Sequence, residues 1–356
     1  MQLPSALSWL IDDAAALPAA DALLSGLGTR LMADGLPLAG GALTLAVPDP
    51  IIAHRTWLWR ADTGAVMEAL GFAGGMAAGD PGNAGRLWLN ALAPGVVHAD
   101  AAGADAPMLG WIAPRAFTAA EAESLRQAAR FATAPLAALA ARATLRAALQ
   151  AYLGKRTAAR VIGSPLQRSV GETIRAALLY ADLRGFTLLS ETAAPAAVIA
   201  ALDAWFDRIG LAVQAFGGEV LKFMGDGLLA IFPVGGDSPR AACDAALRAV
   251  VAARAGMAHL DGTRTAQGLP PLPFGVALHL GEILWGNIGA ADRLDFTAIG
   301  PAVNLVSRLE GLCRPLERPI LISGAVAAET ETPLVSLGTH ALRGVAVPCA
   351  VYTLPD

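Results

Sequence analysis

Gly217–Phe232 reads GGEVLKFMGDGLLAIF, with two apolar runs on either side of a Gly-Asp-Gly turn. An Asp-Gly pair between apolar runs is a strong hairpin signal, so this stretch predicts two antiparallel strands with Asp226 at the tip. Lys222 lies inside the first strand. The chain has 26 basic residues, of which Lys155 and Lys222 are lysines and the other 24 are arginines. Because an ammonium and a planar guanidinium are not interchangeable at a shaped site, the lysine at 222 indicates a geometric requirement.

The length of 356 residues predicts about two domains, and the net charge is −4 with a sequence pI near 5.8. No long basic run is present, which argues against nucleic acid as a partner. The mean hydropathy of +0.51 comes largely from alanine, and the apolar windows fall short of the ~20 residues that a spanning helix needs, so no membrane partner is expected. No signal peptide is recognised and the three cysteines are scattered, which predicts a cytoplasmic location.

Residues 1–116 are predicted to form a small mixed domain of helices and strands. Leucines at helical spacing predict an opening helix from Ser5 to about Met32, which Pro18 should divide. Apolar and aromatic runs predict three strands, at Ala42–Val47, His54–Arg60 and Met108–Ala113.

Residues 117–171 are predicted to be a connecting helix and linker. Thr118 followed three residues later by Glu121 is a capping box, and an alanine-rich helical pattern begins directly after it. Pro135 is expected to kink this helix and Gly154 to break it. The apolar spacing is compatible with a parallel dimer seam but includes too few heptads to establish one.

Residues 172–356 show the pattern strand, helix, hairpin, helix, hairpin, helix, strand, strand. This order predicts an α+β domain in which helices pack on a mostly antiparallel sheet. The second hairpin is expected between Phe274–Leu280 and Ile283–Ile288, with its turn at Gly281-Glu282.

Two carboxylates stand at the ends of predicted elements, Asp182 at the end of a strand and Asp226 at the hairpin tip. Singly, each has an ordinary explanation, as a helix N-cap and a turn residue. If the two strands are neighbours in the sheet, however, both carboxylates meet at one edge. A few hard oxygen ligands without nearby Cys or His suit Mg²⁺ or Mn²⁺ held jointly by the protein and a nucleotide's phosphates.

Asn304 and Arg308 are four residues apart on a predicted helix and therefore share one face. The small and apolar positions of the helix fall on the opposite side. Both polar side chains are thus predicted to point away from the core, toward solvent, a partner or a ligand. The positions assigned to the buried side are Ala302, Val306, Leu309 and Cys313.

Four stretches, in this order, resemble the motifs of the class III adenylate/guanylate cyclase catalytic domain, in its bacterial subgroup with Lys and Thr at the purine-reading positions. The resemblance covers roughly Glu172 to the C-terminus and implies the family's ferredoxin-like fold. The four stretches are Ala181–Thr187, Gly217–Phe232, Gly281–Gly289 and Phe296–Glu310.

The resemblance implies roles for particular residues. It assigns two Mg²⁺ or Mn²⁺ ions per active site and divides the site residues into three groups. These are the metal ligands Asp182, Asp226 and the backbone carbonyl of Leu183; the substrate-binding residues Lys222, Thr297, Phe186 and Thr187; and the catalytic residues Asn304 and Arg308.

The implied reaction is conversion of ATP to 3′,5′-cyclic AMP and pyrophosphate by attack of the ribose 3′-hydroxyl on the α-phosphate, in signal transduction. Lys222 favours ATP because adenine N1 accepts a hydrogen bond, whereas guanine N1 donates one; Thr297 is compatible with either base. In the family, two catalytic domains share each site. A full set of site residues in one chain therefore implies a homodimer with two composite sites.

Residues 1–116 resemble a GAF-type sensor in layout and would receive an unidentified small-molecule or protein signal. Three other activities stay open for the catalytic part: a guanylate cyclase, a weak or inactive nucleotide-binding module, and a diguanylate cyclase. For the last, Gly217-Gly218-Glu219 begins the expected hairpin motif, but Val220 and Leu221 do not continue it.

Overall fold

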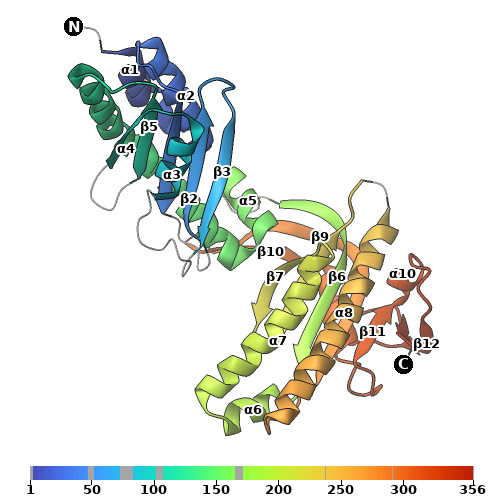
Figure 1. The fold of residues 1–356 in the computed structure, drawn as a ribbon. Helices are drawn as coiled ribbons and strands as arrows, with labels where there is room; N and C mark the ends of the chain where they lie inside the picture. The colour runs from blue at the N-terminus through green and yellow to red at the C-terminus, as the bar shows by residue number, and fades with distance from the viewer. Residues whose placement is uncertain are drawn as a thin grey trace. The chain divides into compact units, whose positions relative to one another are not determined.

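The computed structural model describes residues 3–46, 52–72, 83–101, 107–164, 171–236, 238–290 and 292–355. It divides into two compact units, Met1–Ala148 and Leu149–Asp356, each built around its own sheet (Figure 1). Within the described ranges, no helix combines the length and apolar character that crossing a bilayer requires.

The first unit contains a five-stranded sheet in the order β3-β2-β1-β5-β4, with antiparallel neighbours throughout. The opening helix divides around Pro18, as predicted. The three predicted strands are β1, β2 and β5, although Val47 lies outside the described residues. The elements are α1 (Ser5–Asp12), η1 (Ala14–Ala16), α2 (Ala20–Ala33), β1 (Gly40–Ala46), β2 (Ile52–Arg60), β3 (Val66–Phe72), α3 (Asn83–Leu92), β4 (Val96–Ala101) and β5 (Met108–Ala113).

The core of this unit lies between the sheet, α1, α2 and the first half of α4 (Ala119–Leu153). Trp59 and Trp111 meet edge to face there, with ring centroids 6.3 Å apart. The capping box of α4 is confirmed, because Glu121 accepts from the Thr118 N–H at 2.7 Å and donates its own N–H to Thr118 Oγ1 at 3.2 Å. The helix continues through Pro135 and ends before Gly154, whose φ of 82° is left-handed.

The second unit contains an eight-stranded sheet in the order β12-β13-β11-β9-β6-β8-β7, with β10 paired to β9. Its fold is mixed α+β, as the sequence predicts; β11 pairs with β9 in parallel, whereas the other pairs are antiparallel. The elements are α5 (Lys155–Gly163), β6 (Gly171–Leu183), α6 (Phe186–Thr192), α7 (Pro195–Ala215), β7 (Glu219–Met224), β8 (Gly227–Pro233), α8 (Pro239–Ala266), β9 (Phe274–Gly289), β10 (Leu294–Ile299), α9 (Pro301–Glu310), β11 (Ile320–Ser323), α10 (Gly324–Ala327), β12 (Val335–His340) and β13 (Cys349–Thr353).

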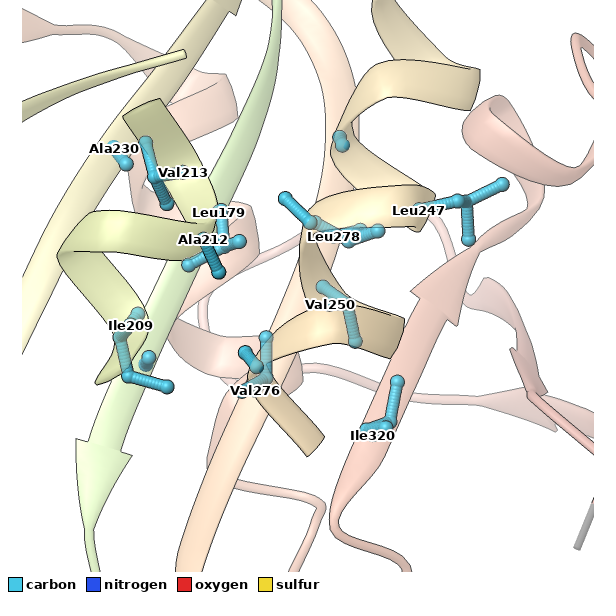
Figure 2. Packing of buried hydrophobic residues seen from close by; sticks show 14 of the residues in the cluster. Leu179, Ile209, Ala212, Val213, Ala230, Leu247, Val250, Val276, Leu278 and Ile320 are labelled. Atoms are coloured by element: carbon cyan, nitrogen blue, oxygen red, sulfur yellow. The ribbon is translucent and has the colours of Figure 1, made fainter. Parts of the chain in front are cut away.

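Helices cover both faces of this sheet. On one face, α7 and α8 pack against β6, β8, β9 and β11, and Figure 2 shows how Ile209, Val213 and Val250 meet strand residues such as Leu179 and Leu278. On the other face, α9 buries Val306 and Leu309 against the same strands. Burial on both faces explains why the central strands are apolar at nearly every position.

The predicted hairpin at Gly281-Glu282 is wrong. β9 is one continuous strand whose partner β6 pairs with it from Gly171↔Gly286 to Leu183↔Phe274. A Cβ at residue 281 would lie 2.6 Å from the Cβ of Ala302, so this glycine allows α9 to approach the strand instead of forming a turn. The second hairpin joins β9 to β10, beginning at the pair Gly289↔Leu294.

Candidate functional site

Asp182 and Asp226 lie at the same edge of the sheet. β6 and β8 are direct neighbours, with Asp182 opposite Gly227, and Asp226 is the turn residue immediately before Gly227. A Cβ at residue 227 would lie 2.9 Å from Asp182 Oδ2, so the second glycine of the turn makes room for this carboxylate. The two strands are therefore neighbours, as the sequence interpretation required.

The backbone of the hairpin tip is held from two directions. The carbonyl of Asp226 accepts a hydrogen bond from the indole Nε1 of Trp205 on α7 at 3.0 Å. It also accepts one from the buried backbone N–H of Leu183 at 3.3 Å. These bonds tie the turn to α7 and to the end of β6, which positions the aspartates by packed elements of the fold.

Burial and the neighbouring charge of Asp226 raise the pKa of Asp182 from 3.8 to about 6, against a smaller opposite effect of Arg184. A partly buried carboxylate beside a second one suits a divalent cation, because the cation would relieve the repulsion between the two aspartates. Among the described residues, no three His, Cys, Asp or Glu side chains form a complete metal-binding group. The pair fits Mg²⁺ or Mn²⁺ if phosphate oxygens or water complete the coordination.

A third carboxylate, Glu310, lies near this pair and was not identified from the sequence. Burial raises its pKa to about 7, and the charges of Asp182 and Asp226 add to the effect. Its Oε1 lies very close to where a Cβ at residue 275 would be, so the glycine there leaves room for this carboxylate. One signal was present, because Glu310 is the last residue of α9 and the helix dipole disfavours a carboxylate there.

Lys222 owes its orientation to a β-bulge. Val220 pairs with Ala230 and Lys222 with Leu229, so Leu221 is an extra residue in the strand. Val220 packs on the side of α7 and α8, whereas Leu221 packs on the side of α9. The Lys222 ammonium forms an ion pair with Asp295 of β10.

Thr297 lies on β10, two residues beyond Asp295 and therefore on the same face of that strand, about 7 Å further along. It is 9% exposed and pairs with Gly286 of β9. The structure thus brings Lys222 to the strand that carries Thr297. Asp295 itself was not singled out from the sequence, because its relation to Lys222 arises only when β10 approaches β7.

Asn304 and Arg308 are exposed on α9, whereas Ala302, Val306 and Leu309 of the same helix are buried. The predicted division of this helix into two faces is confirmed. The Arg308 guanidinium has no ion-pair or hydrogen-bond partner among the described residues, so it is available to a ligand or to another chain.

Phe186 and Thr187 begin α6, directly after Gly185, whose φ of 75° turns the chain out of β6. Phe186 is partly buried against the core under α7 and α8, and Thr187 is exposed. Both follow Asp182 and Leu183 closely in the chain, so these four residues share one end of β6.

Asp182 and Thr297 lie at opposite ends of the ladder formed by β6, β9 and β10. Asp182 is opposite Gly275 of β9, whereas Thr297 is opposite Gly286, eleven residues further along that strand. At about 3.3 Å per residue, this is roughly 36 Å measured along the strand. β10 pairs with β9 on the edge opposite β6, and Asp182 is the next-to-last residue of β6.

Residues 170–344 match the family model described as the adenylate and guanylate cyclase catalytic domain. An adenylate cyclase of Anabaena cylindrica is 31% identical over 172 residues, which cover 47% of this chain and 33% of that protein. Adenylate cyclase 1 of Rhizobium meliloti is 31% identical over 176 residues, 49% of this chain and 26% of that protein. The chain thus matches only about a third or less of the length of these relatives.

A solved structure of a bacterial light-regulated adenylyl cyclase shares the fold, with a TM-score of 0.52 and 24% sequence identity. The superposition covers 61% of this chain and 63% of that one.

Proposed function

Residues 170–344 belong to the adenylate and guanylate cyclase catalytic domain family, and on this premise we propose that the chain is an adenylate cyclase. It converts ATP to 3′,5′-cyclic AMP and pyrophosphate in signal transduction. The observation that carries the choice of ATP is Lys222, whose ammonium is directed to the strand of Thr297. An ammonium only donates hydrogen bonds, so it matches the N1 acceptor of adenine and opposes the N1–H of guanine.

The aspartate pair at the end of β6 holds Mg²⁺ or Mn²⁺ together with the triphosphate, and the Leu183 carbonyl lies at the same strand end. A divalent cation bound there lowers the pKa of the ribose 3′-hydroxyl and offsets charge on the phosphates. Arg308 donates to the α-phosphoryl oxygens as negative charge develops on them, and Asn304 orients the ribose. The exposed position of both side chains supports these roles.

The functional unit is a homodimer with two composite sites. One chain contributes Asp182 and Asp226 to each site, and its partner contributes the purine-reading and α9 residues. This arrangement follows the pattern of the family, in which two catalytic domains share each site, and it is supported by the exposed position of Arg308, whose guanidinium is available to a second chain.

Complementation tests the shared site. Asp182→Asn and Arg308→Ala, each inactive alone, should recover about a quarter of wild-type activity when mixed and allowed to exchange subunits. Half of the dimers are then mixed, and each mixed dimer has one intact site. Mixed dimers without any activity would contradict the composite arrangement.

The substrate is tested directly by incubating the purified chain with ATP or GTP and Mn²⁺ and measuring cyclic mononucleotide. Cyclic AMP as the main product supports the proposal. Cyclic GMP as the main product would identify a guanylate cyclase, and nucleotide binding without turnover would identify an inactive module.

Residues 1–116 are proposed as a sensor domain, 117–171 as the connection and 172–356 as the catalytic domain. A first unit with its own sheet and core supports a separate input role. The test compares the full chain with a fragment that begins near Glu172, across conditions and candidate ligands. Equal activity throughout would remove the sensor role.

A further inference from the structure

The ion pair between Lys222 and Asp295 joins two elements that meet only in the folded domain. Lys222 comes from β7 and Asp295 from β10, and their side chains are 34% and 48% exposed. Such a pair contributes little to stability, since solvent screens it. Its position, one strand repeat from Thr297, therefore points to a role in the site.

The fold directs both partners toward each other. The bulge at Leu221 places Lys222 away from the face where Phe223 packs at a tilt against Phe206 of α7, with ring centroids 4.5 Å apart. On β10, Phe296 packs edge to face on Trp285 of β9 at 5.5 Å, which holds the strand in place. Asp295, the residue before Phe296, is thereby presented to the lysine.

An ammonium has three N–H donors, so one can bind Asp295 while two stay free. The long lysine side chain otherwise samples many rotamers, and anchoring it reduces the entropy lost when it binds a base. Asp295 thus holds the Lys222 ammonium where adenine N1 can accept a hydrogen bond from it.

The same carboxylate has a second consequence for base choice. An unpaired aspartate would accept hydrogen bonds from the N1–H and amino group of guanine, and hydrogen bonds to a charged acceptor are strong ones. While Lys222 neutralises it, Asp295 offers guanine no free charge.

We infer that Asp295 is a specificity-determining residue of the purine site: it positions Lys222 for adenine, and it is a latent guanine acceptor that Lys222 keeps occupied. This inference rests on the proposed function, because it assumes that the base binds beside Lys222. The inference assigns part of the discrimination between adenine and guanine to Asp295, in addition to Lys222 and Thr297.

The test measures binding of 3′-deoxy-ATP and 3′-deoxy-GTP to the full chain with Mn²⁺, by calorimetry. These analogues lack the attacking hydroxyl and therefore cannot cyclise. The quantity compared is the ratio of the two dissociation constants in each variant. Formation of cyclic AMP from ATP is measured separately, so failure of the proposed activity is seen in that assay and the inference is decided by the binding ratio.

Asp295→Asn should weaken 3′-deoxy-ATP binding roughly fivefold with less effect on 3′-deoxy-GTP, and Asp295→Glu should restore most of the preference. Asp292→Asn, an exposed carboxylate just before β10, is the matched control and should leave the ratio unchanged.

The decisive comparison uses Lys222→Met. This variant should shift the ratio toward 3′-deoxy-GTP by about tenfold or more, and adding Asp295→Asn should abolish the shift. An unchanged ratio in Asp295→Asn, an equal shift in the single and double variants, or no binding of either analogue to the wild-type chain would overturn the inference.

Discussion

Replacing Asp182 by asparagine is expected to stabilise the metal-free catalytic unit while removing its response to Mn²⁺. The folded protein holds this carboxylate partly buried and close to Asp226, and both effects raise its pKa from 3.8 to about 6. At neutral pH the group is ionised in both states, but its charge is unfavourable only in the folded one. Asparagine has similar size and no charge, so the substitution removes this cost.

The magnitude follows from the pKa values. A rise from 3.8 to about 6 corresponds to about 3 kcal/mol, at 1.36 kcal/mol for each pH unit. Because Asp182 is only half-buried, solvent screening reduces this to roughly 1–2 kcal/mol. For a unit the size of Leu149–Asp356, the melting temperature should rise by about 2–8 °C.

The sign of the pH dependence is also determined. A carboxyl with a raised folded-state pKa destabilises the protein increasingly as pH rises from about 4 to about 6, and the full cost is present above that range. The advantage of Asp182→Asn should therefore be largest near pH 7.5 and about half as large near pH 5.0. The measurement is calorimetric unfolding of the full chain at both pH values, with chelator or with Mn²⁺.

Asp203→Asn on α7 is the matched control, because Asp203 is an exposed carboxylate. It should change neither the melting temperature nor the Mn²⁺ response. Mn²⁺ should raise the melting temperature of the wild type and of this control but not of Asp182→Asn. An Asp182→Asn protein that melts at or below the wild-type temperature near pH 7.5 without metal would refute the electrostatic reasoning.

Three further outcomes are expected. Arg308→Ala should lower cyclase activity by about 10³-fold with little change in melting temperature, because the side chain is exposed; a lysine control should not restore activity. Glu219→Ala should cost about 1–3 kcal/mol in denaturant unfolding, because buried Glu219 accepts the Thr157 N–H at 2.9 Å; no loss would show that the bond is dispensable. Gly281→Ala should destabilise the catalytic unit by about 1–3 kcal/mol, and adding Ala302→Gly should recover part of the loss, since the two Cβ atoms would collide; no recovery would contradict the packing explanation.

Several parts of the fold and site were predictable because their signals are local. The Gly-Asp-Gly turn specifies the β7–β8 hairpin through the backbone needs of a few adjacent residues. The capping box before α4 acts within four residues, and the spacing of Asn304 and Arg308 places them on the exposed face of α9. Only one further condition, that β6 and β8 are neighbours, was needed to bring Asp182 to the hairpin tip.

The sequence analysis placed the turn of the second hairpin at Gly281-Glu282, where β9 is continuous. Sequence patterns do not reveal the physical reason for this error. A glycine can mark a turn or a place where another element approaches closely, and the two uses look alike in the chain. At Gly281 the approaching element is α9, whose Ala302 is 21 positions away. The choice between turn and contact was therefore made by helix packing.

The sequence by itself determined the periodic elements, the hairpin tip with its aspartate and the residue types available for a nucleotide and a metal, because backbone preference and side-chain alternation operate over a few residues. Tertiary structure alone decided the continuous β9, the bulge that turns Lys222 toward Asp295, and the burial of Glu310 beside the aspartates. These three features depend on which strands and helices meet in the folded chain. Charge, burial and excluded volume act between neighbours in space, whatever their separation in the sequence.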